Sequence, residues 1–257
     1  MESNLMYLSS YICDITPVII SLANNAEKKG WAESHAGNFS IRCPGIKPPE
    51  QSCREILLDF PIPELNHETI LLKKTGVRFR DCQHLQENSY GILHITKGGT
   101  KYQVWHGDTA ETPFLPSTEW LTHLLIHQAI LQNNLPDYAL FHTHPTELIA
   151  ITHRMDENKE SLMNQIMQTM HSEYERYYPY GIGFLDQIQP GSLSLAEQTS
   201  KKILKQPLVL WKNHGSFSIG KDLHDAFDLV ELANKIAQLF LMIYPGKTFQ
   251  EIGSSIE

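Results

Sequence analysis

The sequence has 257 residues, of which 41% are hydrophobic and 19% are charged, and its 21 basic and 29 acidic side chains give a net charge of −8. This length can bury a substantial core, as one large domain or two small ones. The acidic balance disfavours nucleic acid as a partner, because proteins that bind the phosphate backbone usually present a basic face.

Targeting and redox features are few. No segment approaches the roughly 20 apolar residues of a membrane helix, and we find no basic flank followed by an apolar core at the N-terminus. We therefore predict no membrane partner and no signal peptide. The four cysteines match no CxxC spacing and are typical of reduced thiols, which predicts a cytoplasmic protein without cysteine-bound zinc.

The first part of the chain predicts one helix followed by short strands. Thr16 and Pro17 suit the first positions of a helix that Gly30 ends. Strand-like runs then lie at residues 39–41, 56–58 and 70–72, with a proline-rich loop at residues 44–54. Two further runs, at residues 91–95 and 102–105, flank a Lys-Gly-Gly turn and predict a β-hairpin.

The second part alternates helices with apolar strands. Ser117, Thr118 and Glu119 begin a helix that reaches about Gln132, and a buried strand then ends at His144. Further elements are predicted as helices ending near residues 154 and 171, a strand at 182–185, a helix at 193–204, a strand at 208–211 and a long helix at 222–244. Without repeats or a linker, the pattern predicts one α/β domain over residues 1–257.

Two of the predicted strands end in histidines. His142 and His144 are two residues apart, so their side chains point to the same face of the strand. His214 ends another apolar strand, and Gly215 lets the chain turn sharply away. Three imidazoles at two adjacent strand ends would supply the ligands of an open catalytic zinc site. The alternatives are a polar pair facing water and, for His214, a strand cap bonded to a backbone carbonyl.

Glu119 has two interpretations. A carboxylate in the first turn of a helix is favoured by the helix dipole, whether or not it has a chemical role. His123 and His127 follow at four-residue steps, so the three side chains share a helix face that could hold a metal. Because the pattern is not His-Glu-x-x-His, we favour a helix face packed into a core.

Short polar turns predict a place for a phosphate. Gly37–Asn38, Thr75–Gly76 and Ser117–Thr118 expose backbone N–H groups and short side-chain donors that suit a phosphate. Each turn alone is weak evidence, since any turn contains such residues. Four basic residues nearby could add positive potential, although a solvated face is the simpler interpretation for most of them: Lys73, Lys74, Arg78 and Arg80.

Taken in order, these motifs resemble the class II aldolase/adducin family. The stretches that carry the resemblance are Lys29-Gly-Trp-Ala-Glu-Ser-His-Ala-Gly-Asn38, Thr75-Gly76, Pro116-Ser-Thr-Glu-Trp-Leu-Thr-His123, His142-Thr-His144 and Leu208-Val-Leu-Trp-Lys-Asn-His-Gly215. They run along nearly the whole chain, and their order makes the resemblance specific. It implies a single-domain α/β/α sandwich with a central, largely antiparallel sheet, assembled as a homotetramer.

The resemblance also implies a set of site residues. The family's ligands to Zn²⁺ carry over to His142, His144 and His214, and the carboxylate that works beside the zinc carries over to Glu119. The phosphate-binding groups carry over to Asn38, Thr75, Ser117 and Thr118. The branch that acts on rhamnulose 1-phosphate, which the chain resembles most, implies a second acidic residue, and the spacing from His-x-His assigns it to Glu173.

The implied reaction is the reversible cleavage of L-rhamnulose 1-phosphate to dihydroxyacetone phosphate and L-lactaldehyde. Breaking a C–C bond beta to a ketone leaves an enediolate, whose charge the zinc stabilises as a Lewis acid. Glu119 would protonate the enediolate carbon, and Glu173 would assist proton transfer at the departing aldehyde oxygen. Phosphate contacts would position the substrate without entering the bond changes.

Two features depart from the family pattern. His35 stands where the rhamnulose branch carries a phosphate-binding Asn, so phosphate affinity is expected to depend on pH. The sequence after Pro245 is short, so any C-terminal segment that closes over the site is expected to be reduced.

Three other functions stay open. A fuculose-1-phosphate aldolase shares the chemistry, but such chains are generally shorter. A pentulose-phosphate 4-epimerase shares the zinc histidines, but typically has Asp where this chain has Glu119. A non-catalytic adducin-like interaction module is expected to have lost zinc ligands, whereas this chain keeps all three.

Overall fold

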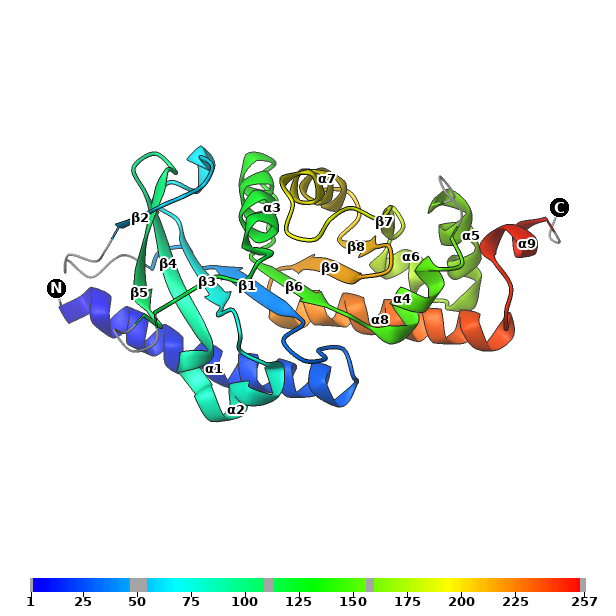
Figure 1. Ribbon diagram of the computed structural model, residues 1–257, viewed down its shortest axis with the longest axis horizontal. Coiled ribbons are helices and arrows are strands. Elements are labelled where there is room, and N and C mark those ends of the chain that lie inside the picture. Colours follow the sequence, from blue (N-terminus) through cyan, green and yellow to red (C-terminus); the bar gives the residue numbers. More distant parts are fainter. Residues whose placement is uncertain (1, 47–54, 109–112, 156–159, 255–257) are drawn as a thin grey trace.

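A largely antiparallel sheet forms the centre of the protein. In the computed structural model, which describes residues 2–46, 55–108, 113–155 and 160–254, nine strands pair in the order β2-β5-β4-β3-β1-β6-β9-β8-β7 (Figure 1). Only β7 and β8 pair in parallel among these strands. The strands are β1 (Asn38–Arg42), β2 (Glu55–Leu57), β3 (Thr69–Lys73), β4 (Tyr90–Thr96), β5 (Lys101–His106), β6 (Ala139–Thr143), β7 (Gly183–Leu185), β8 (Leu208–Trp211) and β9 (Gly215–Gly220).

Helices cover both faces of this sheet. On one face lie α3 (Trp120–Gln132) and α7 (Leu193–Ile203), and on the other lie α1 (Glu2–Lys28) and α8 (Leu223–Ile243) (Figure 1). The predicted α/β/α sandwich is therefore confirmed. The shorter helices are α2 (Cys82–Leu85), α4 (Thr146–Thr152), α5 (Glu160–Met170), α6 (Tyr174–Tyr177) and α9 (Phe249–Gly253), with 3₁₀ turns at Pro63–Leu65, Phe79–Asp81 and Gln86–Ser89. Within the described ranges, no helix combines the length and the apolar character that crossing a membrane requires.

The side chains of β1 alternate between the two faces of the sheet. Phe39 and Ile41 join the apolar core that α1 and α8 cover. Asn38 and Ser40 point to the opposite face, where their side chains bond to residues of α3. Because successive side chains of a strand alternate, one five-residue strand supplies both the core and the polar wall of a site.

The first helix begins earlier than predicted. It starts at Glu2, and Pro17, the predicted first helical residue, lies inside it. The half before the proline also packs, since Leu8 is buried in the core, and this burial offsets the backbone hydrogen bond that an internal proline removes. The predicted end is correct, because Gly30 adopts the left-handed conformation that terminates a helix, with φ of +73°.

The other predicted elements are confirmed within a few residues, apart from the loop at 44–54, of which residues 47–54 lie outside the described ranges. The sequence pattern missed β9, which pairs with both β6 and β8. β6 and β8, the two strands that the histidines end or follow, are therefore separated by β9, a neighbour relation that the sequence spacing left open.

Gly215 also has a different role from the predicted turn. The left-handed residue of this turn is Asn213, with φ of 59°, whereas Gly215 begins β9. A Cβ at Gly215 would lie 2.5 Å from the Thr143 carbonyl oxygen and 2.7 Å from His144 Cδ2. The glycine is therefore required because β9 passes so close to the end of β6.

Candidate metal centre

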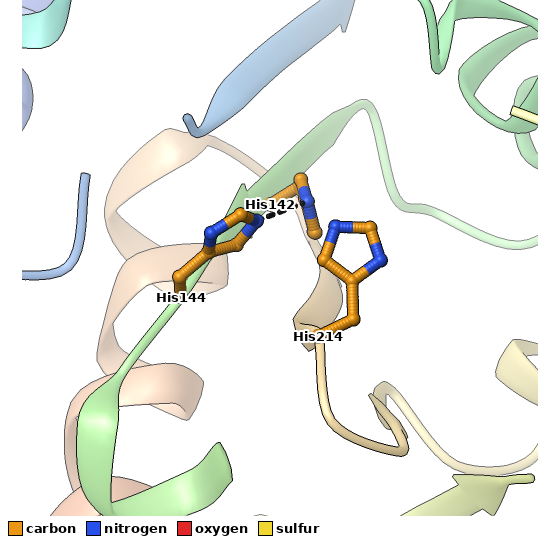
Figure 2. A group of neighbouring side chains, drawn as sticks. All are labelled: His142, His144 and His214. Carbon is orange, nitrogen blue, oxygen red and sulfur yellow. Dashed lines mark hydrogen bonds between the residues drawn. The ribbon is translucent and has the colours of Figure 1, made fainter. Parts of the chain in front are cut away.

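Three histidine side chains converge at the end of β6, as Figure 2 shows. His142 lies in β6, His144 follows that strand, and His214 lies in the turn between β8 and β9. One ring nitrogen of each lies within 4.8 Å of the others, and His142 Nε2 is 3.2 Å from His144 Nε2. In the described part of the chain, no other group of three or more His, Cys, Asp or Glu side chains has the spacing to hold a metal ion.

Hydrogen bonds determine which nitrogens face this centre. His142 Nδ1 lies 2.8 Å from the Ser216 carbonyl oxygen, and His144 Nδ1 lies 2.7 Å from Glu33 Oε1. Both oxygens are acceptors, so both rings donate from Nδ1 and turn the lone pair of Nε2 inward. Two lone pairs that face each other at 3.2 Å repel without a cation between them, so the geometry fits a bound metal.

Burial favours the neutral form of His142 and His214. Desolvation, followed by the nearby His144 and His214, holds the pKa of His142 well below its usual value. Desolvation and then His144 lower the pKa of His214 to about 4. Neutral imidazoles are the form that binds metal ions. The three histidines could bind a metal ion, and three imidazoles are the donor set typical of open catalytic zinc sites.

Glu119 lies against the same centre. It is the N-cap of α3, whereas the sequence predicted it in the first turn of the helix. The residue is 7% exposed. Its carboxylate oxygens lie 3.1 Å from His142 Nε2 and 3.3 Å from His214 Nε2. Desolvation raises the pKa of Glu119, although a hydrogen bond from Asn38 acts in the opposite direction. A buried carboxyl with a raised pKa beside a metal centre suits a group that carries a proton.

His123 and His127 share a helix face with Glu119, as predicted, and both are fully buried. Ser40 Oγ lies 2.7 Å from His123 Nδ1 and 2.8 Å from His127 Nε2. The other ring nitrogen of His123 donates to Asn38 Oδ1. The preferred interpretation of this face as packed into the interior is confirmed.

Two of the segments that carry the predicted phosphate turns pair with each other. Lys74 and Pro116 form an antiparallel β-bridge, and the Thr75 backbone N–H donates to the Leu115 carbonyl oxygen at 2.9 Å. Asn38 Nδ2 donates to Ser117 Oγ at 3.2 Å and to the Glu119 carboxylate at 2.8 Å. Both amide hydrogens of Asn38 are thus engaged, so its side chain has none left for a phosphate.

His35 lies at the rim of the same turns. Its Nδ1 is 2.9 Å from the Gly76 carbonyl oxygen and must donate to it. In the neutral ring, Nε2 therefore carries a lone pair and repels a phosphate oxygen. The pH dependence of phosphate affinity stays a prediction.

Sequence reasoning missed two residues near the centre. Lys73 is 2% exposed, not part of a solvated face, and its Nζ lies 5.6 Å from the centre of the Phe79 ring. Desolvation lowers the pKa of Lys73 to about 8, while Cys82 and Glu119 oppose the shift. Glu33, which orients His144, stands in a stretch that the resemblance includes, but no spacing signal links a side chain to another 111 positions away.

Comparison with known proteins identifies the family. The family described as Class II Aldolase and Adducin N-terminal domain matches residues 18–241. The chain belongs to this family. Rhamnulose-1-phosphate aldolase from Escherichia coli (strain K12 / DH10B) is 30% identical over 233 residues, covering 88% of this chain and 84% of that protein.

Two solved structures extend the comparison. The sugar-phosphate aldolase from Thermotoga maritima has a TM-score of 0.79 and 28% identity, covering 93% of this chain and 98% of the other. An L-fuculose 1-phosphate aldolase has a TM-score of 0.60 and 18% identity, and the match covers 90% of this chain and 86% of the other. At this identity the match shows the shared fold alone. Class II aldolases depend on a metal, and the three-histidine group of this member could bind one.

Glu173 lies apart from this class II aldolase centre. It is the N-cap of α6, and its half-exposed carboxylate lies 3.3 Å from Arg176 Nη1. Together with Tyr177 and side chains of α8 it lines a hollow on the surface. Within the described residues, no contact joins Glu173 to Glu119 or to the three histidines.

Acid is expected to destabilise the metal-free protein. Desolvation lowers the pKa of His123 to about 3 and that of His127 well below its usual value. Below about pH 6.5 the unfolded chain therefore binds protons that the folded chain cannot, so stability falls as pH falls. At about pH 5, one such histidine costs about 2 kcal/mol.

Thermal denaturation between neutral pH and about pH 5 measures this effect. The variant His127→Phe should lose Tm less steeply with acid than the wild type. His84→Phe, at an exposed position of α2, serves as the matched control and should leave the slope unchanged. Equal slopes for all three proteins would show that His127 titrates normally in the folded state.

Proposed function

We propose that this chain is a single class II aldolase domain that uses zinc to cleave L-rhamnulose 1-phosphate reversibly to dihydroxyacetone phosphate and L-lactaldehyde. The observation that carries the proposal is the approach of a buried carboxyl, Glu119, to three inward-facing imidazoles. The name of the relative from Escherichia coli supports the choice of substrate. The free thiols of Cys13, Cys43 and Cys82 support a cytoplasmic location.

Each side chain has a defined part in the proposed reaction. A zinc ion held by His142, His144 and His214 would supply positive charge for the negative charge that develops during cleavage. Glu119 holds the proton that the enediolate carbon takes up in cleavage, and removes it in synthesis.

We propose that the phosphate binds near Thr75–Gly76 and Ser117–Thr118, whose segments are joined by the Lys74–Pro116 β-bridge. The hydroxyls of Thr75, Ser117 and Thr118 and the backbone N–H groups around Gly76 are the available donors. His35, whose Nδ1 donates to the Gly76 carbonyl oxygen, lies beside these donors. Asn38 would contribute through its position beside these turns, since its amide hydrogens are engaged.

The proposed role of Glu173 requires a second copy of the chain. Its contacts do not reach the centre of its own chain, and its carboxylate is half exposed. We therefore propose that the chain assembles as a homotetramer, in which Glu173 of one copy assists proton transfer at the aldehyde oxygen of a neighbouring site.

Metal analysis and an aldehyde-release assay test the proposal together. We expect about one zinc per chain, as in other open three-histidine sites, and cleavage of rhamnulose 1-phosphate faster than of fuculose 1-phosphate or ribulose 5-phosphate. Faster cleavage of fuculose 1-phosphate would reassign the substrate. Epimerisation without free aldehyde would indicate the 4-epimerase, and the absence of both metal and turnover would reject the enzyme.

A further inference from the structure

A buried row of polar side chains leads through the interior to Glu119. Glu119, His123 and His127 are spaced four residues apart on α3, and Asn38 and Ser40 are two apart on β1. Four residues advance about 6 Å along a helix, and two residues advance about 6.6 Å along a strand. Side chains at these spacings can therefore pair repeatedly between α3 and β1. Each of the five is at most 7% exposed.

The hydrogen bonds of this row have one direction. In its ionised form Glu119 only accepts, so Asn38 presents Nδ2 to Glu119 and Oδ1 to His123. His123 therefore carries its hydrogen on Nε2, and its Nδ1 accepts from the Ser40 hydroxyl. With its hydrogen committed, Ser40 Oγ accepts from Nε2 of His127.

The far end of the row is incomplete. His127 Nδ1 is buried and has no hydrogen-bond partner among the described residues. A buried polar atom without a partner costs stability. The polar groups near Glu119 are therefore all hydrogen-bonded, and the unpaired atom lies at the end of the row away from the metal centre.

We propose that Ser40, His123 and His127 are positioning residues for Glu119. They hold the Asn38 amide in the one orientation that donates to Glu119 Oε2, and so fix the carboxyl that faces His142 and His214. Without them the amide is free to turn, and its oxygen would then repel the carboxylate. The catalytic consequence rests on the proposed function, whereas the orientation of the carboxyl does not.

The variant Ser40→Ala interrupts the row without touching the metal centre. In the zinc-loaded enzyme we expect kcat to fall about 10- to 100-fold, because small misplacement of a reacting group costs this much, with KM and zinc content within about twofold of the wild type. In D₂O, exchange of the proton at C3 of dihydroxyacetone phosphate should slow by the same factor. That exchange needs Glu119 but no aldehyde.

Thr122→Val is the matched control. Thr122 lies on the same helix and is fully buried, and its hydroxyl has no partner within the described chain. This variant also removes one buried hydroxyl but leaves the row intact, so kcat and the exchange rate should be unchanged. An equal loss of kcat in Ser40→Ala and Thr122→Val would overturn the positioning role.

Two readouts are independent of activity. Ring ¹⁵N NMR should show His123 and His127 with the hydrogen on Nε2. The Tm shifts of Ser40→Ala and Glu119→Met, which removes the acceptor at similar length, should not be additive, because both break one row. Additive shifts, or a hydrogen on Nδ1 of His123, would overturn the proposed orientation. If the wild type cleaves no sugar phosphate, the proposed function fails, and these two measurements still decide the orientation.

Discussion

Replacing Glu119 by glutamine is expected to lower kcat for cleavage by about 10²- to 10⁴-fold, the contribution of a well-placed general acid or base. Glutamine has nearly the same shape and still accepts the hydrogen bond from Asn38, but it cannot give up or take up a proton. Steady-state release of aldehyde measures the loss. Retention of wild-type kcat would remove Glu119 from the mechanism.

The same variant should keep its metal and gain stability. The three imidazoles are unchanged, so zinc content should stay near one per chain. Because desolvation raises the pKa of Glu119, the stability of the metal-free fold falls as pH rises from about 4.5, where the unfolded chain loses this proton, through the folded pKa. Glutamine carries no charge, and the metal-free variant should therefore have a higher Tm than the metal-free wild type at neutral pH.

Glu33→Gln provides the matched control for Glu119→Gln. The carboxylate of Glu33 accepts from His144 Nδ1, and loss of such an orienting partner typically weakens metal binding 10- to 100-fold, roughly. With saturating zinc, Glu33→Gln should recover most of its kcat, whereas Glu119→Gln should not. Zinc rescue of both variants would mean that Glu119 acts only through the metal.

The sequence predicted the grouping of the three histidines better than the sheet around them. His142 and His144 could be placed on one face because the period of a strand is two. β9 was missed because Gly215–Gly220 has glycine at both ends and two serines, which is typical of a loop. In the fold, Ser216 and Ser218 donate to backbone carbonyls of β6, so small polar residues suit a fully buried central strand.

The polar row beside Glu119 could not be predicted from the sequence, for a different reason. The four-residue spacing on the helix predicted a shared face, but not its partners. Asn38 and Ser40 become partners only through the pairing of β1 with β6, which sets Asn38 opposite His142, and through the packing of α3 on that face. The burial of Lys73 could not be predicted for the same reason, since it depends on how β3 pairs with β1 and β4. Contacts of this kind depend on tertiary structure and leave no local period in the sequence.

Removal of the metal is expected to abolish cleavage and lower stability together. A Lewis acid contributes several kcal/mol to such a transition state, which corresponds to a loss of at least about 10³-fold. Protein stripped with a chelator should regain activity on addition of zinc. Its Tm should rise with zinc concentration, because only the folded chain brings His142, His144 and His214 together.

Single histidine variants distinguish the centre from the other histidines of the chain. His214→Ala removes one of three ligands and should lose both zinc and turnover, and no added zinc at moderate concentration should restore them. His84→Ala, at an exposed position of α2, should behave as wild type. His142→Ala should lose activity equally, but it should also lower Tm in the metal-free state, because His142 is fully buried between Trp211 and Phe217. If stripped protein cleaved the substrate at the wild-type rate, the three imidazoles would have to serve the fold alone, and their inward-facing lone pairs would have no explanation.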